Sequence, residues 1–346
     1  MKKTISLILT IAMILSIVPT SAFAAEDDTY FDYSDVTLGE IQEIFHEYLE
    51  CESFQLTPGT EAYYAYIVDQ LLNRSDVNLK KHESYDLIHS YMVEYKLAYE
   101  DYLLCNDNLT SNNYNADVVT AISETNTCVT YNEDAREVKF DITTEFLSQT
   151  IGDIASSNQM KQRTAEKSVI SATSYSYSGS DAATYAKQYA NDYNAAYPSY
   201  SADCTNYVSQ CLYAGGITMD GSSTSVGTYE STTDWYCIYI KSVLWIRKYA
   251  VTTSWIRVSD FSSFMSSIAT KTTHTTINSL YEACEIGDIV QLVDKNTGSA
   301  YHSIIITGRD STSAYYSGHS NDRKDVDIED TLDENSDNFI LFDFTT

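Results

Sequence analysis

Apolar and polar residues alternate along this chain with two different periods, and the change of period divides it into parts. Three early segments carry apolar side chains at helical spacing, and three later segments, rich in β-branched residues, alternate at strand spacing. The helices are expected at 37–49, 60–72 and 85–104, and the strands at 117–123, 127–131 and 137–143. We therefore predict a small α+β domain over residues 30–151.

A polar stretch separates this part from the rest of the chain. Residues 152–180 are rich in Ser, Lys, Thr and Tyr and end in Ser178-Gly179-Ser180, a composition typical of a linker. Helical spacing resumes over residues 182–195 and stops before Pro198. A second domain is therefore predicted over residues 181–346.

The segment from Asp203 to Gly216 predicts a helix with a cysteine in its first turn. Apolar residues recur at i, i+3, i+4, i+7 and i+8 counted from Cys204, so one face meets a core. Asp203 is expected to cap this helix through its carboxylate, and Gly215-Gly216 to end it. The positive potential at a helix N-terminus favours the thiolate, the nucleophilic form of cysteine. A buried structural cysteine is the alternative interpretation.

The C-terminal part changes to strand spacing. Strands are predicted at 289–293, 301–307 and 313–317, with turns at Asn296-Thr297-Gly298 and Gly308-Arg309-Asp310. Helices followed by antiparallel strands give an α+β fold class.

Two histidines lie where neighbouring strands would bring them together. His302 lies at the start of one predicted strand and His319 lies just after the end of the next, so we expect them to be approximate cross-strand neighbours. A cysteine nucleophile needs a base to accept its proton, and the base needs a third group to orient it. Cys204, His302 and His319 would supply these groups. Structural roles for both histidines are one alternative; a metal site with Cys204 is another, although local ligand spacing is lacking.

Composition limits the class of protein. The chain of 346 residues has a formal net charge of −28, which argues against non-specific nucleic-acid binding. Seven cysteines, none in a CxxC pair, leave at least one thiol unpaired in an exported protein. The 30 tyrosines are expected to be half-buried or to line a carbohydrate or peptide groove.

Residues 1–24 have the layout of a secretory signal peptide. Lys2 and Lys3 precede an apolar run from Ile5 to Val18, and Ala22-Phe23-Ala24 forms a small-x-small cleavage site. The run is shorter than the ~20 residues that span a bilayer, so we predict cleavage rather than anchoring. No later apolar run is long enough to span a membrane. The mature protein is predicted to be secreted.

Ordered blocks of the second domain resemble a known family. The helical block Asp203-Cys204-Thr205-Asn206-Tyr207-Val208-Ser209-Gln210 is followed by Gly287-Asp288-Ile289-Val290, Tyr301-His302-Ser303-Ile304-Ile305 and Ser317-Gly318-His319-Ser320-Asn321-Asp322. These blocks, within residues 181–345, resemble the amidase domain of secreted proteins of Gram-positive bacteria. That domain is similar to the NlpC-type and CHAP cysteine peptidases, which cut cell-wall peptides.

The resemblance implies a papain-like, NlpC-type fold that hydrolyses an amide or peptide bond without a cofactor or metal. Cell-wall peptidoglycan is the expected substrate. By position, Cys204 would be the nucleophile and His302 the general base. His319 would be the orienting residue, with Asn321 or Asp322 as alternatives. The backbone N–H of Cys204 would help to bind the oxyanion.

Other interpretations stay open at this point. One is a non-catalytic wall-binding or partner-binding protein that retains the fold, and another is a protease acting on proteins. Residues 30–151 would hold the enzyme on the wall, cover its cleft or present a partner. The sequence specifies no oligomeric state. Structural roles are expected for Asn206, Ser209, Asp288, His46, His82 and His89. The acidic stretch 325–337 is expected to be a solvated loop, with cation binding as the alternative.

Overall fold

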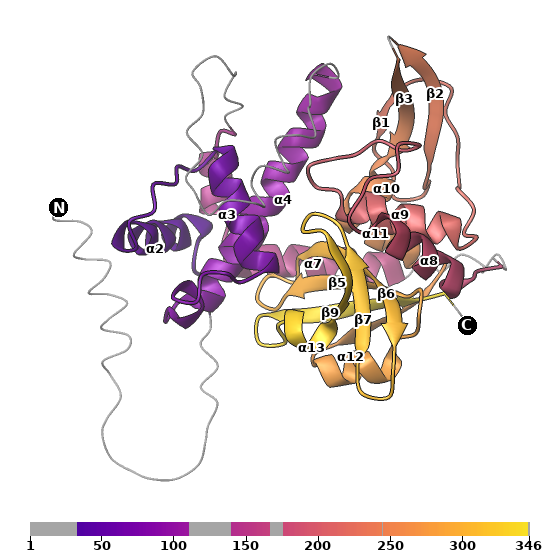
Figure 1. Ribbon diagram of the computed structural model, residues 1–346. Helices are drawn as coiled ribbons and strands as arrows, with labels where there is room; N and C mark the ends of the chain where they lie inside the picture. Colours follow the sequence, from indigo (N-terminus) through magenta and orange to yellow (C-terminus); the bar gives the residue numbers. More distant parts are fainter. Residues whose placement is uncertain (1–32, 111–139, 167–175, 244, 345–346) are drawn as a thin grey trace. The chain divides into compact units, whose positions relative to one another are not determined.

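Helices come first along the chain and antiparallel strands last in the computed structural model, which describes residues 33–110, 140–166, 176–243 and 245–344 (Figure 1). The helices are α2 (Leu38–Cys51), α3 (Glu61–Leu72), η1 (Leu79–Lys81), α4 (Tyr85–Thr110), α6 (Thr144–Ser148), α7 (Ile151–Glu166), α8 (Gly179–Tyr189), α9 (Cys204–Ala214), α10 (Thr253–Ile256), α11 (Val258–Met265), α12 (Ile277–Ala283) and α13 (Ile328–Thr331). The strands are β1 (Gly227–Tyr229), β2 (Cys237–Val243), β3 (Ile246–Thr252), β4 (Thr270–His274), β5 (Ile289–Asp294), β6 (Ala300–Arg309), β7 (Ala314–Gly318), β8 (Arg323–Asp327) and β9 (Asp337–Asp343).

A six-stranded sheet with the order β4-β9-β5-β6-β7-β8 forms the centre of the C-terminal part. All its neighbouring strands are antiparallel. The three strands predicted from alternation correspond to β5, β6 and β7. The mixed fold of helices and antiparallel strands is therefore confirmed.

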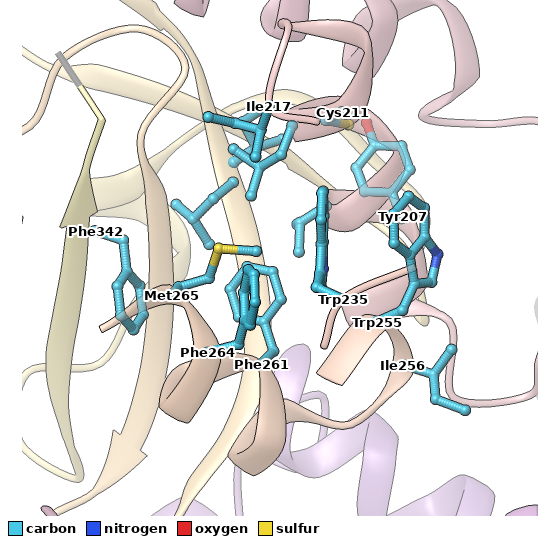
Figure 2. Close-up of a cluster of buried hydrophobic side chains, with 14 of the residues drawn as sticks. Tyr207, Cys211, Ile217, Trp235, Trp255, Ile256, Phe261, Phe264, Met265 and Phe342 are labelled. Carbon is cyan, nitrogen blue, oxygen red and sulfur yellow. The ribbon is translucent and has the colours of Figure 1, made fainter. Parts of the chain in front are cut away.

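Helices α8, α9 and α11 pack against β6. Figure 2 shows the apolar cluster that joins them, in which Trp235 and Trp255 lie near Tyr207 of α9 and Phe264 of α11. The two indole rings are 4.4 Å apart between centroids. Burial of such large aromatic side chains fixes α9 relative to the sheet.

The turn between α12 and β5 needs a glycine. Gly287 has a φ of +99°, and a Cβ atom there would lie 2.2 Å from the Cα atom of Gly179 at the start of α8. Because no side chain fits this gap, the two glycines let α8 lie directly on the sheet.

Helix α4 and the end of α3 pack on the same sheet through buried charges. The Arg74 side chain pairs with Asp333 at 3.2 Å and with Asp337 at 3.5 Å. His89 Nδ1 lies 2.9 Å from Asp294 Oδ1. Residues 34–346 accordingly form one compact unit, so the helices predicted as a separate domain share an interface with the sheet.

Three predicted segments differ from the structure. Residues 152–166, expected to begin the linker, belong to α7 (Ile151–Glu166). Residues 140–143, expected to end a strand, are not a strand. The acidic stretch 325–337 is not a solvated loop, because Asp333 and Asp337 are buried against Arg74. The signal peptide, the strands expected at 117–123 and 127–131 and part of the linker lie outside the described residues.

A smaller sheet with the order β1-β3-β2 lies between α9 and α10 in sequence. Strands β2 and β3 form an antiparallel hairpin, and β1 pairs with β3 in parallel. Sequence alternation did not predict this sheet. None of the helices within the described residues is long and apolar enough to cross a membrane.

Candidate active site

Cys204 is the first residue of α9, and its side chain is 2% exposed. Asn206 and Ser209 of this helix accept hydrogen bonds from two buried tryptophans, which fix the position of the helix. Trp255 Nε1 donates to Asn206 Oδ1 at 2.9 Å, and Trp235 Nε1 donates to Ser209 Oγ at 3.2 Å. The structural roles predicted for Asn206 and Ser209 are confirmed.

Asp203 does not cap α9, which corrects the sequence prediction. Its backbone lies at the N-cap position in a helical conformation, and its side chain accepts no bond from the first turn's N–H groups. The carboxylate instead accepts from His319 Nδ1 at 2.7 Å, Asn206 Nδ2 at 2.9 Å and the Tyr200 N–H at 2.9 Å. Asp203 thus fixes the loop before Cys204 rather than the helix end.

Both ring nitrogens of His319 are engaged. Nδ1 donates to Asp203, and Nε2 donates to the backbone oxygen of Tyr189 at 2.7 Å. The ring also stacks on Tyr207 at 4.0 Å between centroids. Both acceptors lack protons, so the imidazolium form satisfies both bonds. Burial lowers the pKa of His319, but the hydrogen bond and charge of Asp203 outweigh it and raise that pKa above its usual value.

Strand β6 meets the first turn of α9 at Ser303. Thr205 Oγ1 lies 3.3 Å from Ser303 Oγ, and Gln291 Nε2 donates to the same hydroxyl at 3.2 Å. A backbone interaction with Ser303 lowers the pKa of the Cys204 thiol. The first turn of α9 therefore contacts the start of β6.

His302 and Ser303 are consecutive in β6, so their side chains point to opposite faces of the sheet. The His302 ring lines a small cavity of about 10 Å³ together with Leu72, Arg74 and Asn321. The ring is 5% exposed, and Nδ1 has no hydrogen-bond partner among the described residues. Burial, with the charges of Lys96 and Arg323, lowers the pKa of His302 to about 3.

Residues of α3 and α4 act electrostatically on the cysteine. Lys96 is fully buried, donates to the Tyr301 backbone oxygen at 2.7 Å and pairs with Glu100 at 2.6 Å. The Tyr64 hydroxyl donates to Glu100 at 2.8 Å. Burial raises the pKa of the Cys204 thiol, while the Lys96 charge lowers it and the Glu100 charge raises it. The thiol is therefore protonated in this closed arrangement.

The three predicted site residues are brought to one region but not into one hydrogen-bonded chain. Among the described residues, no hydrogen bond joins His302 to Cys204 or to His319. Of the alternatives for the orienting residue, Asn321 lines the His302 cavity, whereas Asp322 interacts with His319. The described residues also contain no group of three His, Cys, Asp or Glu that could hold a metal ion.

The structure also shows the roles of Asp288 and His89 and the state of several cysteines. Asp288 is a turn residue as expected, since its carboxylate accepts from the Glu285 N–H at 2.8 Å. His89 is a core histidine. Cys51, Cys204, Cys211, Cys237 and Cys284 are free cysteines.

Comparison with known proteins identifies the region that carries this site. Residues 176–342 match the family model described as “Putative amidase domain”. The match includes α9 and β5 to β7, and with them Cys204, His302 and His319. It indicates a hydrolase of amide bonds.

The curated relative described as “Uncharacterized protein YhbB”, from Bacillus subtilis (strain 168), is 45% identical over 47 residues. That alignment covers 14% of this chain and 15% of the relative's length. No solved structure matches the chain.

Sequence reasoning missed the residues that lie outside the amidase region. Lys96, Glu100 and Tyr64 belong to α3 and α4, yet they contribute to the surroundings of Cys204. The i,i+4 spacing of Lys96 and Glu100 was the only signal, and such a pair usually lies on an exposed helix face.

Proposed function

We propose that this protein is a secreted cysteine hydrolase with a papain-like, NlpC-type amidase region that cleaves an amide or peptide bond in cell-wall peptidoglycan. The observation that carries the proposal is the position of Cys204, as the first residue of α9 and against the start of β6. A helix N-terminus stabilises a thiolate and offers free N–H groups to an oxyanion. The amidase match supplies the class of bond.

In the proposed mechanism, Cys204 is the nucleophile and His302 is the general base. His302 takes the thiol proton, and the sulfur forms a bond to the carbonyl carbon. The backbone N–H of Cys204 stabilises the oxyanion. His302 then protonates the leaving nitrogen as the C–N bond breaks, which leaves a thioester. Water, deprotonated by His302, hydrolyses this thioester and releases a carboxylic acid and the free thiol.

We propose that the buried arrangement of Cys204 and His302 is a closed resting state of the enzyme. The thiol is buried with a raised pKa, and burial together with the Lys96 and Arg323 charges lowers the pKa of His302 to about 3. When α3 and α4 withdraw, water reaches both groups. Rehydration lowers the pKa of Cys204 and raises that of His302, which brings both toward the values that proton transfer needs. The N-terminal helices would thus cover the cleft.

The test is digestion of purified peptidoglycan by the mature protein, with mass spectrometry of the released fragments. Cys204→Ala should release nothing, because the nucleophile is gone. Cys211→Ala, which removes a second buried thiol from the same helix, is the matched control and should retain the activity. Equal release by the wild type and Cys204→Ala would contradict the proposal.

The same experiment separates the alternatives. If no variant releases fragments while all bind the wall equally, the protein is a binding protein that retains the fold. If the wild type leaves peptidoglycan intact but cleaves unfolded polypeptides in a Cys204-dependent way, it is a protease acting on proteins.

A further inference from the structure

The β2–β3 hairpin has a buried base and an exposed end. Cys237, Ala250 and Val251 at its base are buried. Figure 1 shows the two strands extending away from α10, against which β3 packs. The far end of the hairpin makes no contribution to the amidase site, so its composition needs another explanation.

Large apolar side chains occupy this exposed end. Val243 and Ile246, which pair across the strands, are 44% and 46% exposed, and Trp245 is 98% exposed. Trp245 also has a φ of +71°, a left-handed conformation that favours Gly or Asn at hairpin turns. A tryptophan here costs both local strain and exposed apolar surface, and such a cost is typical of a functional position.

The hairpin is also basic within a strongly acidic chain. Residues 237–252 contain Lys241, Arg247 and Lys248 and no Asp or Glu, whereas the whole chain has a net charge of −28. The Arg247 guanidinium lies over the Tyr239 ring at 5.7 Å from its centroid. The apolar end is therefore flanked by positive charge.

We propose that the end of this hairpin inserts into the interface of an anionic lipid bilayer. Val243, Trp245 and Ile246 would enter the boundary between headgroups and acyl chains, where tryptophan is enriched. Lys241, Arg247 and Lys248 would lie at the headgroup level and interact with anionic lipids. The protein would bind one leaflet peripherally.

Charge and apolarity together favour a bilayer over other anionic partners. A soluble polyanion would attract the basic residues but offers no apolar phase for Trp245. A glycan would stack on the aromatic rings but does not require the positive charges. Strands of seven residues extend roughly 23 Å, whereas electrostatic interactions are screened over about 8 Å at physiological salt. The acidic remainder therefore repels the membrane only weakly.

Bromolipid quenching of tryptophan fluorescence tests this directly with the full chain. Of the three tryptophans, Trp235 and Trp255 are fully buried, so quenching reports Trp245. We expect quenching and co-sedimentation with phosphatidylglycerol vesicles that contain brominated lipid, and much weaker signals with phosphatidylcholine vesicles. Binding should fall as salt is raised.

Three variants separate the apolar and electrostatic contributions to membrane binding. Trp245→Ser should lower the partition coefficient about tenfold or more, since it removes the largest inserted side chain. Arg247→Gln should lower it about fivefold. Val77→Ser, a matched change at a residue that is 59% exposed elsewhere, should have no effect. The exposure of Trp245 makes a folding defect unexpected, and circular dichroism checks this.

Several outcomes would overturn the inference. These are no binding to phosphatidylglycerol vesicles at low salt, equal binding by the wild type and Trp245→Ser, or binding only to soluble polyanions or purified glycan. Activity on peptidoglycan is not part of this readout, so the membrane inference and the proposed hydrolase can fail separately.

Discussion

Asp203 and His319 form a buried, hydrogen-bonded pair that holds the segment just before Cys204. The carboxylate accepts three hydrogen bonds, and the ring donates two. Cys204 follows Asp203 directly, so the position of its sulfur depends on this pair. A residue that seemed to be a helix cap is thus a positioning residue.

Asp203→Asn should destabilise the protein by about 3 kcal/mol near pH 6, because it leaves the imidazolium buried without its ionic partner. The pKa of His319 is raised in the folded protein, so its contribution is present at about pH 6.5 and below. It is lost as the pH rises through the folded pKa. Burial also raises the pKa of Asp203, so the pair loses its charge again when that carboxyl is protonated at acidic pH. Urea unfolding at several pH values measures the difference from the wild type.

The exposed Asp234→Asn serves as the control for that series and should change the free energy of unfolding little at any pH. A difference between wild type and Asp203→Asn that stays constant from about pH 5 to about pH 9 would contradict the assignment of the imidazolium form.

Thiol accessibility gives a second test at the scale of single residues. Cys204 is buried with a raised pKa, whereas Cys51 is exposed. In the folded protein at about pH 8, iodoacetamide should label Cys204 roughly tenfold or more slowly than Cys51. Peptide mapping by mass spectrometry measures both rates in one sample. Equal rates would show that the closed arrangement does not persist in solution.

At the scale of elements, the end of α3 is joined to the sheet through Arg74. Its guanidinium contacts two buried carboxylates and donates to the Thr331 backbone oxygen at 2.8 Å. The same end of α3 supplies Leu72 to the His302 cavity. Loosening Arg74 should therefore open the site.

Arg74→Met should cost about 3–5 kcal/mol, since Asp337 would stay buried without this cation. Labelling of Cys204 should become faster. Lys80→Met is the matched control: Lys80 is 49% exposed and lies 3.7 Å from Asp333, so its loss should cost less than about 1 kcal/mol. Faster Cys204 labelling in both variants, or in neither, would contradict the role given to α3 as a cover.

The elements that sequence predicted best are those with a single clear period. Helix α9 and strands β5 to β7 follow directly from alternation and turn residues, and Cys204 follows from its place in the first turn. The face of His302 could not be predicted, because a β-bulge at Tyr301 intervenes in the pairing of β6 with β5. The sequence did not predict the β2–β3 hairpin, because its strands carry apolar residues at both buried and exposed positions and therefore show no simple alternation.

In the molecule as a whole, the sequence could not predict which charged residues from distant segments are buried together. Asp333 and Asp337 lie in an acidic stretch that resembles a solvated loop, yet Arg74, far away in sequence, compensates them. Lys96 and His89 likewise find their partners only in the folded chain. Local composition cannot reveal such pairs, and they join the N-terminal helices to the amidase region.

The net charge of −28 makes a prediction for the molecule as a whole. Repulsion among surface carboxylates destabilises the compact state, and salt screens it more than it screens the buried pairs. The Tm should therefore rise by several degrees between about 10 mM and about 150 mM NaCl. Differential scanning calorimetry measures it. A Tm that falls with salt would show that exposed ion pairs dominate the stability.

In the proposed mechanism, Cys204 forms a thioester with the acyl part of an amide substrate. Mass spectrometry of the protein, acid-quenched during turnover of peptidoglycan fragments, detects this intermediate. We expect an acyl adduct on the peptide that contains Cys204, removed by hydroxylamine and absent from Cys204→Ala. Product formation by Cys204→Ala at the wild-type rate, with no adduct on the wild type, would contradict this mechanism.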